Sequence, residues 1–233
     1  MESLLIWKTR KVSLPVIIRQ ILFTGVESLP IVTFVALGVG GLIILQGYNL
    51  LSNFGQGNWI HTILVSVVIR ELSGIFTALI VIARSGTAIS TELGNMVVNR
   101  EIDLLRSFKI SPLSYLVTSR VTGVVVAMII LTIYFNITAV LGGWVFSSMF
   151  SRIDFLSFMS GFTNTLRVMD ILLSAIKSWI FGLIIALISC YQGLQVKSAL
   201  TEVPQRTIRA VVLAMVFVII SDVALTWLFY YIT

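Results

Sequence analysis

The chain has 233 residues, of which 58% are hydrophobic and only 11% are charged. A soluble domain carries about 25% charged residues, so this composition, with a mean hydropathy of +1.03, excludes a water-soluble globule. The net charge is +6; in so apolar a chain the lysines and arginines are expected to set the orientation in a membrane, and no nucleic-acid partner is expected.

Length and residue types also limit the architecture and the chemistry. One helical crossing of a membrane takes about 20 apolar residues, so we expect a single all-α, polytopic membrane domain over residues 1–233. Cys190 is the single cysteine and His61 the single histidine, which excludes an internal disulfide and leaves too few ligands for a zinc or haem site. No metal or cofactor is expected in this chain.

The N-terminal segment, residues 1–28, is predicted to contain an amphipathic helix on the inner face of the membrane. Its apolar side chains recur at helical spacing along one face: Leu14, Ile17, Ile18, Ile21 and Leu22. Such a stripe suits a helix that lies in the membrane interface, and also an ordinary juxtamembrane anchor. The first crossing is predicted over residues 29–50.

The second crossing is predicted over residues 59–83. The 42 residues between Glu27 and Arg70 carry no formal charge, which is enough for two crossings joined by the polar turn 52–58. The second crossing contains Arg70 and Glu71 and ends near Arg84. A turn at Arg70 would instead give six crossings in all.

A short amphipathic helix is predicted in the following loop, over about residues 100–110. Asn99 is suited to cap it, and Ser111-Pro112 to stop it. Its apolar residues Ile102, Leu105 and Phe108 share one face, so the helix either docks on a partner or packs under its own bundle.

Three further crossings are predicted, over residues 119–147, 171–194 and 209–231. Twelve of the 16 lysines and arginines then lie on one side of the membrane, and only Arg152 and Arg167 on the other. Positive charge is retained on the cytoplasmic side. We therefore expect five crossings, with the N-terminus in the cytoplasm and the C-terminus outside.

Four charges fall inside the predicted crossings: Arg70, Glu71, Lys177 and Asp222. A central Arg, Lys or Asp costs roughly 2.5–3.5 kcal/mol on insertion scales, so these side chains should face protein or water. We expect Arg70 and Glu71 to reach Asp222 and Lys177 on neighbouring helices and to frame a polar patch. The alternative is a purely structural ion-pair network.

Catalytic motifs are missing from the sequence. Lys177-Ser178 and Lys197-Ser198 lack the preceding glycine of a phosphate-binding loop, and no nucleophile elbow of the G-x-S-x-G kind occurs. We therefore expect a protein that is not an enzyme.

One long run of residues carries a resemblance to a known family. Residues 70–96 read R-E-L-S-G-I-F-T-A-L-I-V-I-A-R-S-G-T-A-I-S-T-E-L-G-N-M. This run resembles the signature of the MlaE/YrbE permeases of ABC transporters, roughly R-E-L-G-P-V-L-x-A-L-x-x-A-G-R-x-G-x-x-x-x-x-E-L-G-x-M. The likeness continues at residues 102–105, at Lys177-Ser178 and at residues 191–193. Ser73-Gly74 departs from the usual Gly-Pro.

The resemblance implies an architecture and partners. Such permeases are five-span subunits of a bacterial inner membrane, with an N-terminal interfacial helix and a cytoplasmic coupling helix. They pair as dimers, here expected to be homodimers. Cytoplasmic ABC ATPase subunits, which bind ATP and Mg²⁺, lie below them, and an MCE-domain protein lies outside. They move phospholipid or a similar hydrophobic molecule between membranes.

The resemblance also implies roles for particular residues. The intramembrane charges Arg70, Glu71, Lys177 and Asp222 would sense a lipid headgroup or lock the resting state. Contacts with the ATPase are expected from the cytoplasmic residues Glu92, Glu101, Asp103 and Leu105. Contacts with acyl chains are expected at the outer end of the first crossing, from Tyr48, Leu51 and Phe54.

Two other functions fit the residues alone. In an ion- or proton-coupled secondary carrier, Glu71 and Asp222 would relay protons. No inverted internal repeat supports that carrier. A structural membrane subunit without a cavity is the second alternative, and co-purification with an ATP-hydrolysing partner distinguishes all three.

Overall fold

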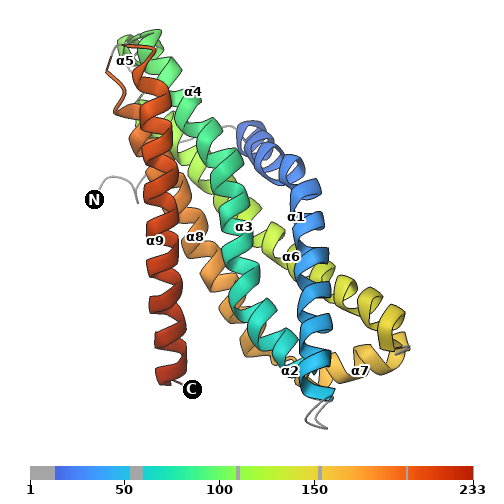
Figure 1. Cartoon of the computed structure of the whole chain (residues 1–233). Helices are drawn as coiled ribbons and strands as arrows, with labels where there is room; N and C mark the ends of the chain where they lie inside the picture. Colours follow the sequence, from blue (N-terminus) through green and yellow to red (C-terminus); the bar gives the residue numbers. More distant parts are fainter. Residues whose placement is uncertain (1–13, 53–59, 109–110, 152–153, 198, 233) are drawn as a thin grey trace.

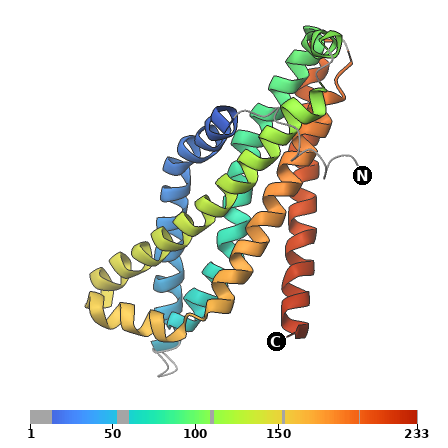
Figure 2. The ribbon, with the colours of Figure 1, turned by 180° about the vertical axis from the view of Figure 1, so that it is seen from behind.

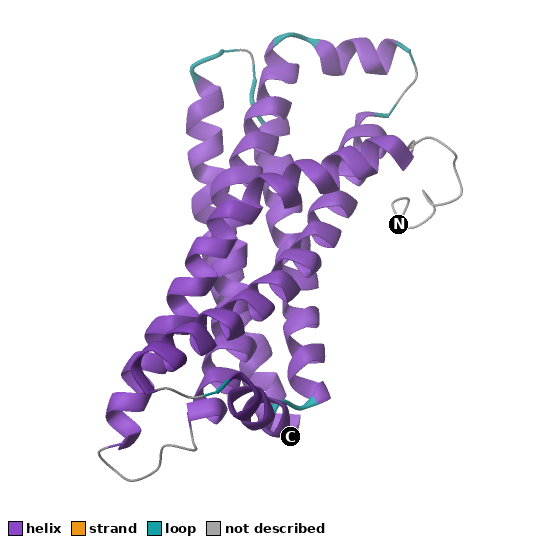
Figure 3. Ribbon diagram, turned by 90° about the vertical axis from the view of Figure 1, so that its right-hand side faces the viewer, coloured by secondary structure: helices purple, strands orange, loops and turns teal. Residues whose placement is uncertain are grey.

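The computed structural model describes residues 14–52, 60–108, 111–151, 154–197 and 199–232. Helices and short connections make up this described part, and it contains no strand (Figure 3). Five helical stretches are long and apolar enough to cross a membrane: Pro15–Gly47, His61–Val98, Tyr115–Met149, Val168–Leu194 and Glu202–Tyr231. The predicted all-α fold with five membrane-spanning helices is confirmed.

The first helix, α1 (Leu14–Ser52), joins the predicted interfacial segment to the first crossing without a break. Pro30 lies inside it, and a proline removes one backbone hydrogen bond and bends the helix. The first turns accordingly run obliquely to the rest of α1 (Figures 1 and 2). The predicted interfacial segment and the first crossing are thus parts of one continuous helix.

The second crossing is one continuous helical rod, built from five consecutive segments. They are α2 (Ile60–Ile63), η3 (Leu64–Leu72), α3 (Ser73–Val81), η4 (Ile82–Gly86) and α4 (Thr87–Val98). The segments η3 and η4 are π-helical. No turn occurs at Arg70, and the helix continues past the predicted end at 83.

A short helix, α5 (Glu101–Ser107), follows directly. Arg100 links it to α4 with a φ of 59°. The sequence predicted that Asn99 caps α5. In the structure Asn99 instead ends α4. The third crossing then begins with the π-helical η5 (Leu113–Val117) and continues through α6 (Thr118–Ser151).

A helix absent from the sequence prediction, α7 (Phe155–Thr165), lies across the end of the bundle opposite α5 (Figure 1). The Asp154 carboxylate caps it by accepting the backbone N–H of Leu156 at 3.2 Å. Its side chains Phe158 and Phe162 are buried. The last two crossings are α8 (Val168–Leu194) and α9 (Glu202–Ile232).

The centre of the bundle is α6, which packs against α1 on one side and α8 on the other. The α1–α6 contact is close because glycines face backbone there. A Cβ on Gly142 would lie 2.7 Å from the Leu37 carbonyl oxygen, and such small residues permit close helix packing in lipid. In contrast, α9 packs mainly against α8 and α4 and leaves most of its surface exposed.

Candidate functional site

The Lys177 ammonium is the centre of a buried polar cluster inside the bundle. Lys177 lies on α8, and its side chain is 1% exposed. Its Nζ donates to Glu71 Oε2 at 2.6 Å, to Thr226 Oγ1 at 2.7 Å and to the Arg70 carbonyl oxygen at 3.1 Å. These three bonds use all three donors of an ammonium group.

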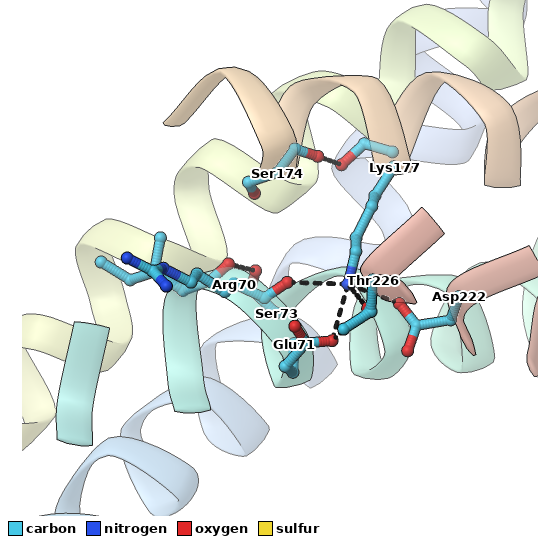
Figure 4. A network of polar contacts seen from close by, with 9 residues as sticks. Arg70, Glu71, Ser73, Ser174, Lys177, Asp222 and Thr226 are labelled. Atoms are coloured by element: carbon cyan, nitrogen blue, oxygen red, sulfur yellow. Dashed lines mark hydrogen bonds and ion pairs between the residues drawn. The ribbon is translucent and has the colours of Figure 1, made fainter. Parts of the chain in front are cut away.

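Two carboxylates flank this lysine. Glu71 comes from η3, and Asp222 from α9 places Oδ1 2.9 Å from Lys177 Nζ. The Thr226 hydroxyl donates to Glu71 Oε2 at 2.9 Å and so links α9 directly to the second crossing. The cluster therefore ties three crossings together at one point (Figure 4). We call Lys177, Glu71, Asp222 and Thr226 the lysine cluster.

Arg70 forms a second ion pair, with a partner that the sequence analysis did not identify. Its Nε lies 2.7 Å from Asp170 Oδ1 on α8, and Asp170 is fully buried. The Arg70 guanidinium also lies 5.8 Å from the centre of the Phe229 ring, a distance at which a cation is attracted to an aromatic face. The side chain points away from Lys177 (Figure 4).

The predicted association of the four charges is thus only partly what the structure contains. It brings Glu71, Asp222 and Lys177 together, whereas Arg70 pairs with Asp170 instead of Asp222. Adjacent helical residues point about 100° apart, so Arg70 and Glu71 serve different partners. A buried ion pair that keeps both partners avoids the large cost of a lone buried charge.

Asp170 and Thr226 are the two members that sequence reasoning missed. Asp170 precedes Lys177 by seven residues and Thr226 follows Asp222 by four, and both spacings place residues on one helix face. That spacing was the available signal. Asp170 was overlooked because the fourth crossing was expected to begin at 171, although α8 begins at Val168.

Two cavities lie beside these ion pairs. A partly open apolar cavity of about 290 Å³ is lined by residues of α6, α7 and α8, by Leu166 between α7 and α8, and by Ile69 of η3. Its lining includes Phe162 and Leu166, and Asn136 is its single polar residue. A polar cavity of about 500 Å³ lies between the start of the second crossing and the junction of α7 with α8.

The predicted ATPase-contact residues divide into two groups. On α5, the side chains of Glu101 and Asp103 are exposed, and Asp103 forms an exposed ion pair with Arg106 at 3.3 Å. Leu105 is partly buried and Ile102 is buried against the bundle, which leaves Leu104 and Phe108 as the exposed apolar side chains.

Glu92 lies elsewhere, on α4. It pairs at 2.9 Å with the buried Arg120 of α6, and both line a cavity of about 550 Å³ next to the start of α1. This contact fastens α4 to α6.

The predicted acyl-chain residues cannot be placed as side chains. Phe54 lies outside the described residues. Tyr48 and Leu51 belong to the last turns of α1, but their side chains also lie outside the described part of the chain.

Comparisons with known protein sequences cover nearly the whole chain. The family model described as "Permease MlaE" matches residues 17–228. This chain belongs to the MlaE permease family. The matched range includes the sequence run that contains Arg70 and Glu71.

Several known proteins are similar to this chain. A probable ABC transporter permease protein of Rickettsia prowazekii is 34% identical over 93% of this chain and 84% of its own length. The intermembrane phospholipid transport system permease protein MlaE of Haemophilus influenzae is 29% identical over 91% and 82%. The chloroplastic protein TRIGALACTOSYLDIACYLGLYCEROL 1 of Arabidopsis thaliana is 30% identical over 91% and 61%.

Proposed function

We propose that this chain is the membrane permease subunit of an ABC transporter that moves phospholipid, or a similar hydrophobic molecule, between membranes. The observation that carries the proposal is the MlaE family match over residues 17–228, in a chain whose lysine cluster joins three crossings. The printed name of the Haemophilus relative supports phospholipid as the substrate class.

The energy for transport comes from a separate ATPase in this proposal. ATP and Mg²⁺ bind to cytoplasmic subunits that contact α5 through Glu101 and Asp103. ATP-driven closure of these subunits moves α5. In the chain, α5 lies between α4 and η5 and is joined to each by a short connection. A displacement is thereby passed up the helical rod to Glu71.

The lysine cluster acts as a lock between two packing arrangements of the bundle. In the arrangement described here, Lys177 satisfies all three of its donors. Movement of the second crossing against α8 and α9 replaces those hydrogen bonds with others. ATP binding shifts the equilibrium between the two arrangements, and this shift moves the substrate through the bundle. No bond is broken in this chain.

The remaining assignments follow the family architecture. Two copies form a homodimer in the bacterial inner membrane, with the N-terminus cytoplasmic and the C-terminus periplasmic. An MCE-domain protein docks at the outer end, where α7 and the polar cavity lie. Tyr48, Leu51 and Phe54 contact acyl chains at that end.

The test is transport by the native complex in vesicles. The chain is purified with its co-purifying ATPase, reconstituted, and supplied with fluorescent phospholipid and ATP. We expect ATP-dependent lipid transfer that stops with a non-hydrolysable analogue. Transfer driven by a proton gradient without ATP would contradict the proposal and favour a secondary carrier.

A further inference from the structure

The helix α1 consists of two limbs that are held to the bundle in different ways. Pro30 lies inside α1, and we call residues 14–29 the first limb and residues 31–52 the second limb. The second limb is fixed by backbone contact, because Gly142 of α6 lies directly against it. The first limb turns away at an angle from this fixed part (Figure 2).

The junction of the two limbs has the properties of a hinge. Pro30 supplies no backbone N–H for the Val26 carbonyl oxygen, so one helical hydrogen bond is missing there. One turn earlier, the Ser28 hydroxyl donates to the Thr24 carbonyl oxygen at 2.7 Å, and such side-chain bonds bend helices. Hinges absorb backbone rotation over a few residues of this kind.

The first limb lies over a cavity instead of a filled core. This cavity of about 550 Å³ is lined by the first limb, α4, η5 and α6. Protein interiors are normally close-packed, so the limb lacks packing contacts along this stretch. The limb reaches α6 through Gln20, whose Cγ would lie 2.5 Å from a Cβ on Gly123. A hinge beside a cavity leaves the limb free to change its angle.

One ion pair ties the first limb to the second crossing. Arg84 Nη2 of η4 donates to Glu27 Oε2 at 2.8 Å. Among the described residues, this is the one polar bond between the limb and the second crossing. Both side chains are about 40% exposed, and ion pairs that water can reach are weak. The bond can therefore open without disrupting the core.

The position of Arg84 gives this ion pair control over the helical rod. Along the chain, η4 lies between α5 and η3, the segment that contains Glu71. A displacement that passes along the rod from α5 to Glu71 has to pass η4. While Glu27 holds Arg84, the rod cannot slide without also turning the first limb about Pro30.

We propose that the first limb of α1 is a hinged arm that the Glu27–Arg84 ion pair latches to η4, so that the second crossing shifts when this latch opens. In the latched state the arm covers the cavity beneath it. In the open state the arm swings about Pro30 and the cavity is exposed. The latch stands independently of transport, whereas its opening by ATP rests on the proposed function.

The test measures how fast a thiol in the cavity reacts with N-ethylmaleimide in the purified complex, first without nucleotide. Ser119 lines the cavity and is only 2% exposed, so Ser119→Cys reports the opening of the arm. Cys190→Ala removes the native thiol in all variants. Ser73→Cys, at a fully buried position of α3, reports general loosening of the bundle.

The variants remove the latch from either side. Glu27→Gln and Arg84→Gln should each raise the labelling rate of Ser119→Cys about threefold, the size expected for the loss of an exposed ion pair. The two changes together should add nothing further, because they remove the same bond. Exchange of the charges, Glu27→Arg with Arg84→Glu, should restore slow labelling. Arg209→Gln removes an exposed arginine of α9 and is the matched control.

The possible outcomes separate the latch from the proposed function. Unchanged labelling in both single variants, additive effects in the double variant, or an equal rise at Ser73→Cys overturns the inference. With the latch intact, a non-hydrolysable ATP analogue should also raise labelling of Ser119→Cys. Labelling that responds to the latch variants but not to the analogue supports the latch and contradicts the ATP-driven movement in the proposed function.

Discussion

At the scale of single residues, the bundle depends on one ammonium group that serves three crossings. Lys177 is more deeply buried than either carboxylate beside it, with its side chain 1% exposed against 28% for Glu71 and 10% for Asp222. The lysine is consequently the member whose removal leaves the largest uncompensated charge.

Replacing Lys177 with Met should destabilise the chain by about 3–5 kcal/mol, because two carboxylates then face each other without a cation. Thermal unfolding in detergent, followed by tryptophan fluorescence, measures the loss. Lys197→Met removes an exposed lysine and should have no effect.

A triple variant separates stability from transport. Lys177→Met with Glu71→Gln and Asp222→Asn removes the charges together, and should recover most of the stability. If the cluster is the proposed lock, ATP-driven transport stays absent in this variant. Recovery of transport along with stability would mean that the cluster is purely structural.

At the scale of helices, the closest packing occurs where α1 crosses α6. A Cβ on Gly142 would approach Leu37 backbone atoms at 2.7 and 2.8 Å, and backbone cannot yield as a flexible side chain does. Gly142→Ala should therefore cost about 1–3 kcal/mol of stability by overpacking.

The control for this substitution lies on the same helix pair. A Cβ on Gly38 of α1 would meet nothing within 4 Å, so Gly38→Ala should leave the unfolding temperature unchanged or slightly raised. Comparable losses in both variants would show that the close contact at Gly142 does not govern the effect.

The short helix α5 presents a charged surface that the bundle does not use. Glu101→Lys with Asp103→Lys should leave the unfolding temperature unchanged, because exposed ion pairs contribute about 0–1 kcal/mol. The same change should reduce lipid-stimulated ATP hydrolysis by the complex about tenfold, since interface charges of the wrong sign cost several kcal/mol.

The control is Ser157→Lys, an exposed position on α7 at the opposite end of the bundle. Full coupling between ATP hydrolysis and lipid transfer in the Glu101/Asp103 variant would count against contact between α5 and the ATPase.

At the scale of the whole molecule, five crossings place the start of α1 and the end of α9 at opposite ends of the bundle (Figures 1 and 2). Single cysteines test the orientation with a membrane-impermeant maleimide. Ser157→Cys on α7 should be labelled from outside, and Thr201→Cys, between α8 and α9, only after the membrane is opened.

The native thiol offers little background for this labelling, because Cys190 is 2% exposed. Labelling of Thr201→Cys from outside would reverse the orientation.

The number of crossings was predictable because long uncharged runs and the distribution of Lys and Arg leave few alternatives. The end of the second crossing was not, because Arg84 pairs with Glu27 of α1 at 2.8 Å and the helix continues past it. The short helix α7 mixes Ser, Thr and Asn with its apolar residues, so hydropathy alone does not reveal it.

The candidate site was predictable only in part. A charged side chain inside a membrane crossing is costly in free energy, so its presence indicates a buried partner. This argument identified Arg70, Glu71, Lys177 and Asp222. The pairing of these charges depends on how each helix is rotated about its axis and on the π-helical winding of η3, and neither can be read from one sequence. Asp170 was not identified because the predicted crossing began at 171, whereas α8 begins at Val168.

The π-helical geometry of η3 determines which of its side chains points at Lys177. A π-helical stretch accommodates an additional residue relative to α-helix, and one residue corresponds to about 100° of rotation. If η3 relaxed to ordinary α-helical winding, the register would slip by about one position. The direction now taken by Glu71 would then pass to a neighbour such as Arg70 or Leu72, and attraction to the lysine would turn into repulsion or into no electrostatic contact. A change of winding over a few residues is thus enough to invert the sign of the force between two crossings.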